Sequence, residues 1–121
     1  MTDDEILAFA RSMRSIWTVE LLLRLAGSAD RWWSRQELVG ELRASSSVVS
    51  QGIDALSRSG LVSESDGRFN YAPRDGALHE LVTELGRLYR ARPLAVTQAM
   101  FDESSAVARF SDAFRIRREE E

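Results

Sequence analysis

The segment SRQELVGELRASSSVVSQGIDALSRSGL, which runs from Ser34 to Leu61, constrains the fold of this chain more than any other part of it. Ser34 is followed three residues later by Glu37, which is the spacing of a capping box at a helix start. Leu38 and Leu42 lie four residues apart and therefore share one helical face. The first part of the segment predicts a short amphipathic helix.

A second helix is predicted after the serine run that begins at Ser45. Val49, Ile53 and Leu56 recur at helical spacing, and Gly60 can adopt the left-handed conformation that ends a helix. Two short helices joined by a tight turn form a helix-turn-helix.

Extended structure is predicted directly after this helix pair. Leu61 and Val62 open the run SGLVSESDGRFNYAP, in which Asp66-Gly67 is a turn signal between two short β-type segments. The sequence therefore predicts a β-hairpin that follows the second helix.

The chain resembles the winged helix-turn-helix transcription regulators, broadly of the MarR-like bacterial type. Those proteins commonly show the pattern L-x-x-S-x-x-x-V-S-x-x-[LI]-x-x-L-x-x-x-G-L-[VI]. The residues that match this pattern without a gap are Leu42, Ser45, Val49, Ser50, Ile53, Leu56, Gly60, Leu61 and Val62. The resemblance implies a mostly α fold with a small β-hairpin wing, in which a winged helix-turn-helix is flanked by N- and C-terminal helices.

Two features depart from the pattern of this family. Arg43 occupies the turn between the helices, where a glycine or another small residue is common. The exposed face of the second helix, on which basic side chains are often found, holds Ser46, Ser47, Gln51 and Asp54. Both departures bear on function, because they alter the surface that would meet DNA.

Length and composition favour one globular domain over residues 1–121. The chain is 44% hydrophobic and 29% charged, and no linker-like segment divides it. No apolar run approaches the roughly 18 residues that suggest a membrane span. The N-terminus is acidic where a signal peptide would be basic. We expect no membrane partner and a cytoplasmic location.

Residues suited to catalysis or metal binding are scarce. The chain has no cysteine and one histidine, His79, which we expect to be a surface or inter-helix polar residue. No nucleophile elbow, phosphate loop or zinc-protease motif occurs. We therefore expect no enzyme, no catalytic residues, no metal site and no cofactor.

The remaining sequence predicts helices on both sides of the central motif. N-terminal helices are expected over residues 1–26 with a break at 12–15, the helix-turn-helix and wing over 31–73, and C-terminal helices over 75–118. Arg31-Trp32-Trp33 resembles a short first strand, which would place Trp32 and Trp33 on opposite faces. Asp75 can cap the next helix, and Pro93 fits the start of another.

The last helix carries a seam of apolar side chains, with Glu103 at one seam position. The seam residues are Val96, Met100, Val107, Phe110 and Phe114. In MarR-like proteins the terminal helices of two subunits interlock, so the resemblance implies a homodimer through these residues. The alternative is a monomer in which the helices fold back on their own winged domain.

The resemblance also implies how double-stranded DNA would be contacted. The amino end of the second helix would enter the major groove. The arginines that flank this surface and the one at the hairpin would contact the DNA backbone or the minor groove. The expected DNA-binding residues are Arg35, Arg43, Ser45, Ser46, Ser47, Gln51, Arg58 and Arg68. Alternatively, Ser45 is only a helix cap, and Arg43 and Arg58 are solvated or paired with Glu41 and Asp54.

Charge leaves a second function open. All 16 basic residues are arginine, yet the net charge is −3, which opposes binding to phosphates. Asp54, Glu64 and Asp66 lie where phosphates would approach. The sequence therefore predicts a DNA-binding transcriptional regulator, with a winged-helix module that binds a protein partner as the alternative.

Aromatic residues allow one more interpretation. Phe9, Trp17, Trp32, Trp33 and Tyr71 could line an effector pocket, as in some MarR-like regulators. The alternative, which we favour, is that these large side chains at helical or strand spacing belong to the core.

Overall fold

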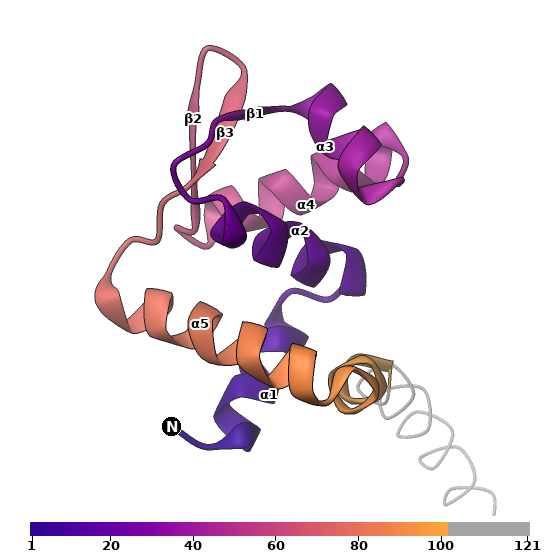
Figure 1. The fold of residues 1–121 in the computed structure, drawn as a ribbon, viewed down its shortest axis with the longest axis vertical. Coiled ribbons are helices and arrows are strands. Elements are labelled where there is room, and N and C mark those ends of the chain that lie inside the picture. Colours follow the sequence, from indigo (N-terminus) through magenta and orange to yellow (C-terminus); the bar gives the residue numbers. More distant parts are fainter. Residues whose placement is uncertain (102–121) are drawn as a thin grey trace, which may run out of the picture.

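The computed structural model describes residues 1–101 and has a mostly helical fold with a small antiparallel sheet (Figure 1). In chain order the elements are α1 (Asp3–Ser12), α2 (Ile16–Gly27), β1 (Trp33–Ser34), α3 (Arg35–Leu42), α4 (Ser46–Arg58), β2 (Val62–Ser65), β3 (Arg68–Tyr71) and α5 (Gly76–Ala91). Residues 93–101 are also helical. The predicted α-rich fold with a β-hairpin is confirmed at this level.

The sheet has three strands in the order β1-β3-β2, and both pairings are antiparallel. The hairpin turns at Asp66 and Gly67, whose φ angles are 52° and 72°, so the turn signal in the sequence is confirmed. The first strand begins at Trp33 and not at Arg31 as predicted. Trp33 lies opposite Phe69 in the register, and both side chains are buried.

Asn70 fixes the loop before β1 to the hairpin. Its amide nitrogen Nδ2 donates to the carbonyl oxygen of Ala29 at 2.6 Å and to that of Arg31 at 3.0 Å. Two backbone acceptors far away in sequence are thereby satisfied by one side chain on β3.

The helix pair forms as its local signals predict. Ser34 and Glu37 form a complete capping box at the start of α3, and Ser45 caps α4 by accepting from the backbone N–H of Val48. Arg43 ends α3 in the left-handed region with φ 55° and ψ 40°. A side chain with a Cβ is strained in this region, which explains why a glycine is common at such a turn.

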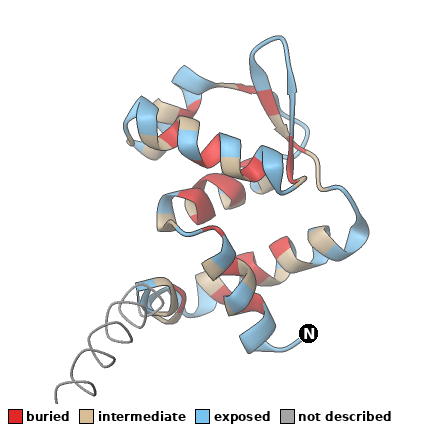
Figure 2. Ribbon diagram, turned by 180° about the vertical axis from the view of Figure 1, so that it is seen from behind, coloured by how far each residue is buried: buried red, intermediate tan, exposed pale blue. Residues whose placement is uncertain are grey.

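The core forms around α2, which packs against α4, α5, α3 and β3. Figure 1 shows α2 in the middle of the molecule, between α4 on one side and α5 on the other. The inward faces of these helices carry the buried positions (Figure 2). The largest fully buried side chains are Phe69, Leu21, Leu22, Leu25, Leu38, Ile53, Leu56, Leu61, Leu85, Val19, Val49 and Val96.

Gly52 allows α2 and α4 to pack close together. A Cβ at this position would lie 2.8 Å from Cδ2 of Leu21 and 3.5 Å from Oγ1 of Thr18. A residue larger than glycine would therefore have to displace a buried leucine.

The two ends of the described chain form a second helical layer, in which α1 packs against α5. The predicted break between the first two helices is confirmed, since α1 ends at Ser12 and Arg14 has a φ of 65°. Pro93 starts a new helical segment, as expected. Within residues 1–101, no helix combines the length and apolar character needed to cross a bilayer.

Candidate nucleic-acid interface

The amino end of α4 lies at the surface. Ser45, Ser46 and Ser47 are all exposed, and the hydroxyl of Ser45 is engaged as the cap of the helix. Ser45 is therefore a helix cap, as one of the two interpretations of the sequence expected. The hydroxyl of Ser46 forms no hydrogen bond within residues 1–101. A helix start of this kind presents backbone N–H groups and the positive end of the helix dipole.

An exposed polar stripe continues along α4 from this end. Ser47, Gln51, Asp54 and Arg58 follow one another at intervals of four and three residues, and all four are exposed. The opposite face is held in the core by residues such as Val49 and Ile53, each 1% exposed. Because the apolar face packs in the core, the polar stripe lies on the exposed face of α4.

Arg35 joins the start of α3 to α4 and to the hairpin. Its Nη1 donates to the hydroxyl of Ser50 at 2.6 Å, and its guanidinium carbon lies 5.1 Å from the ring centroid of Phe69. Because these two contacts hold the guanidinium group in place, Arg35 is in part a structural residue.

Arg43, Arg58 and Arg68 are exposed and form no ion pair with a carboxylate of the described residues. Glu41, considered as a partner of Arg43, is paired with Arg24 across a distance of 3.1 Å. The alternative in which these arginines are neutralised by Glu41 and Asp54 is therefore not realised. Their charges are available to a partner.

Acidic side chains accompany these arginines. Asp54 lies in the exposed stripe of α4, and Glu64 and Asp66 are exposed on the hairpin. The register places Glu64 opposite Phe69, on the same side of the sheet, whereas Arg68 lies opposite Ser65 and therefore on the other side. The four candidate arginines outnumber these three acids by one.

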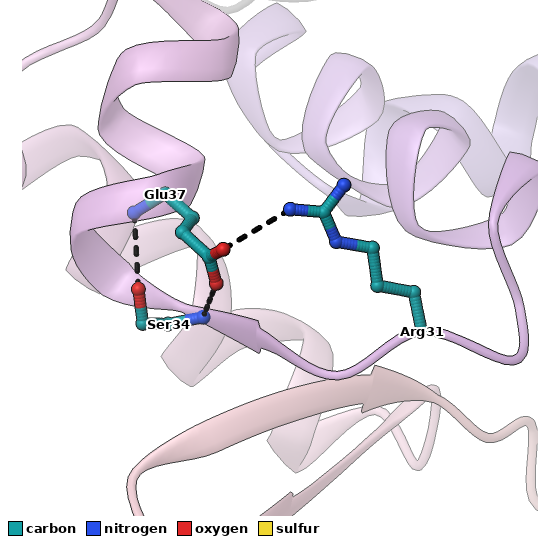
Figure 3. A network of polar contacts seen from close by, with 3 residues as sticks. All are labelled: Arg31, Ser34 and Glu37. Carbon is teal, nitrogen blue, oxygen red and sulfur yellow. Dashed lines mark hydrogen bonds and ion pairs between the residues drawn. The ribbon is translucent and has the colours of Figure 1, made fainter.

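A polar network anchors the amino end of α3 and holds this surface in place (Figure 3). Arg31 Nη2 lies 3.1 Å from Oε2 of Glu37, while Oε1 of Glu37 accepts from the backbone N–H of Ser34 at 2.9 Å. The hydrogen bond from this N–H, followed by the contacts with Arg31, lowers the pKa of Glu37. Arg31 also lies over the Trp33 ring, 3.6 Å from its centroid.

The part played by Arg31 in this network was not predicted. The Ser34–Glu37 spacing identified the capping box itself, but a flexible arginine outside the helix leaves no periodic signal.

His79 is exposed on α5 and is therefore a surface polar residue, one of the two roles expected for it, and its contact is with a strand and not with another helix. Its Nδ1 lies 2.9 Å from the hydroxyl of Tyr71, so the first turns of α5 are connected to the end of β3. Burial raises the pKa of Tyr71. Within residues 1–101, no three histidine, aspartate or glutamate side chains gather in a group that could hold a metal ion.

The aromatic residues separate into core and surface. Trp33 and Tyr71 are buried and Phe9 packs against the core, as expected, whereas Trp17 and Trp32 were expected in the core as well and are exposed. Trp32 lies outside β1 and is 40% exposed, whereas Trp33 is 3% exposed, so one of the two tryptophans is inward as expected. Trp17 is 42% exposed and lines a hollow between α2 and α3.

The predicted dimer seam is only partly within the described residues. Val96 is fully buried against the core of its own chain, and Met100 packs against the same core. Val96 is thus a core residue and has no surface left for a partner subunit. Val107, Phe110 and Phe114 lie outside the described residues.

Comparisons with protein-family models, with curated proteins and with solved structures found no match to this chain.

Proposed function

We propose that this chain is a winged helix-turn-helix protein that binds double-stranded DNA and regulates transcription. In this proposal α3 and α4 are the helix pair, α4 is the recognition helix and the β2–β3 hairpin is the wing. The observation that carries the proposal is the exposed amino end of α4, with Arg43 in the turn before it exposed and without an ion pair to any of residues 1–101. Had this end been packed into the core, no such function would be open to the fold.

Each part of the surface has a role that its chemistry allows. Gln51 and the exposed serines supply hydrogen-bonding groups for base edges in the major groove, glutamine being suited to adenine. Arg43 at the turn and Arg68 on the hairpin contact the phosphate backbone on either side. Arg35 contributes mainly by holding α3, α4 and the hairpin in one arrangement.

A homodimer is part of the same proposal. Leu94 and Phe101 lie seven residues apart in the helical segment 93–101 and are 71% and 72% exposed. Side chains at this spacing share one helical face, which would bury apolar surface if a second copy covered it. Two recognition helices related by a two-fold axis would fit half-sites about 34 Å apart.

The test is a fluorescence-polarisation titration with the DNA upstream of its own gene, at low and at moderate salt. The affinity should fall as salt rises, with a slope that reflects the number of phosphates contacted. The double variant Arg43→Ala/Arg68→Ala should bind more weakly and with a smaller slope. Arg87→Ala is the matched control, because this arginine on α5 pairs with Glu84. Absence of binding at low salt would exclude the proposal.

A protein-interaction module is the second candidate, and Asp54 is the observation that favours it. This carboxylate lies within the exposed stripe of α4 without an ion-pair partner in the described residues. A phosphate backbone would be repelled there, whereas a basic partner protein would be attracted. Asp54→Asn distinguishes the two functions: DNA binding should tighten, whereas binding to a basic protein surface should weaken.

A further inference from the structure

We infer that the hollow between the start of α2 and the end of α3 is a binding site for a small organic cation with an apolar or aromatic body. The hollow has a volume of about 310 Å³ and is lined by Ile16, Trp17, Glu20, Arg24, Glu41 and Leu42. This volume is at the small end of the range of ligand pockets, roughly 300–1,000 Å³. The site is separate from the surface proposed to meet DNA and does not depend on that proposal.

The lining offers a cation both a carboxylate and an aromatic face. Glu20 and Glu41 outnumber Arg24, so the charged lining carries a net charge of −1. Glu41 holds Arg24 through Oε1, and Glu20 accepts from the hydroxyl of Tyr89 through its own Oε1. The second oxygen of each carboxylate has no partner within residues 1–101, so each carboxylate keeps an acceptor for a ligand.

Trp17 supplies the aromatic face. This side chain lines the hollow and is 42% exposed, so a ligand that covered it would bury apolar surface of the indole ring. An indole ring is the best of the aromatic side chains at binding a cation over its face. Ile16 and Leu42 add apolar surface for the body of the ligand.

The helix ends at the hollow also favour a cation over an anion. The negative end of the α3 dipole lies at Glu41 and Leu42. The positive end of α2 is already occupied, because the N–H of Trp17 donates to the hydroxyl of Ser15 and the N–H groups of Thr18 and Val19 donate to the Ser15 carbonyl. In this first turn of α2, only the backbone N–H of Ile16 is left to donate to an anion.

The test titrates the full chain with three probes that each carry one phenyl ring. Binding is monitored by NMR through the indole N–H signal of Trp17. Benzyltrimethylammonium should bind saturably, whereas benzyl alcohol should bind much more weakly and benzenesulfonate not at all. Trp17→Leu should weaken binding of the cation by about threefold or more; for this variant the titration is followed by calorimetry. Trp32→Leu is the matched control, since Trp32 is equally exposed but lies elsewhere, and should leave binding unchanged.

A pair of charge variants separates recognition from loss of structure. Glu41→Gln and Arg24→Gln both remove the ion pair between α2 and α3, so a purely structural effect would change the affinity in the same direction. Direct recognition requires opposite directions: Glu41→Gln should weaken binding of the cation, and Arg24→Gln should strengthen it. Equal binding of the sulfonate, or parallel changes in the two variants, would overturn the inference.

Discussion

Arg35 and Ser50 connect the two helices of the candidate interface, since Nη1 of Arg35 donates to the Ser50 hydroxyl at 2.6 Å. The bond joins the first residue of α3 to the middle of α4, and the same guanidinium lies over the ring of Phe69. The orientation of α4 is therefore fixed from the polar side as well as from the core.

Replacing Arg35 should lower stability, whereas replacing Arg43 should not. Arg35→Ala removes a hydrogen bond to a hydroxyl and a cation–π contact, so the free energy of unfolding should fall by about 1–2 kcal/mol. Arg43→Ala removes an exposed side chain without a partner in the described residues, and should change it by less than about 0.5 kcal/mol. Urea unfolding measures both. A double-mutant cycle with Ser50→Ala should show coupling only to Arg35.

Arg43→Gly should raise stability while it weakens DNA binding. The left-handed conformation of Arg43 is strained by its Cβ, and glycine relieves about 1 kcal/mol, less the entropy that glycine adds to the unfolded chain. Arg14→Gly is the control, because Arg14 also has a positive φ but lies between α1 and α2. Both variants should raise the urea midpoint, and only Arg43→Gly should reduce affinity in the polarisation titration. A loss of stability in both would contradict the account of strain.

Replacing either of two helical glycines by alanine should change the stability, and the two changes should be opposite in sign. A Cβ added at Gly40 in α3 would have no other atom within 4 Å. Gly40→Ala should therefore raise the free energy of unfolding by roughly 0.5–1 kcal/mol through the higher helix propensity of alanine. Gly52→Ala gains the same propensity but forces a Cβ to 2.8 Å from Leu21. Overpacking typically costs about 1–3 kcal/mol, so the net change should be destabilising. Thermal unfolding of the two variants gives the comparison, and equal melting temperatures would show that the Leu21 side chain can move aside without cost.

The tyrosines should titrate at unusually high pH. Burial, followed by the hydrogen bond and charge of Glu20, raises the pKa of Tyr89 from 10.0 to about 12. Because the folded state holds this proton more tightly than the unfolded state, the stabilisation is complete below pH 10 and is lost as the pH rises toward 12. Tyr89→Phe should make the free energy of unfolding depend less on pH in this range.

The chain suits such a titration because it contains no lysine and no cysteine. The near-ultraviolet absorbance of phenolate reports both tyrosines, and Tyr89→Phe should leave only the transition of Tyr71. Ionisation of Tyr89 near pH 10 in the folded protein would contradict the raised pKa and its attribution to burial and Glu20.

Local signals in the sequence predicted the elements well. The Ser34–Glu37 capping box, the positive φ at Gly60 and the turn at Asp66–Gly67 each depend on residues within a few positions of one another. The backbone conformation at such sites follows from short-range sterics and hydrogen bonding. The helix pair and the hairpin could therefore be located without the structure.

Contacts between distant parts of the chain could not be predicted in this way. Tyr89 and Glu20 are separated by 69 positions, and their pairing depends on how α5 packs against α2. Val96 shows the same limit for apolar residues: helical spacing predicts a buried face, but it does not distinguish the core of the same chain from that of a second subunit.

The double donation by Asn70 makes the loop before β1, and with it an edge strand of the sheet, sensitive to a very small chemical change. Both backbone oxygens that it holds would face carboxylate oxygens if the amide were hydrolysed in an ageing sample, so attraction would become repulsion. A preparation could then keep its mass and helix content almost unaltered while the edge of its sheet came loose.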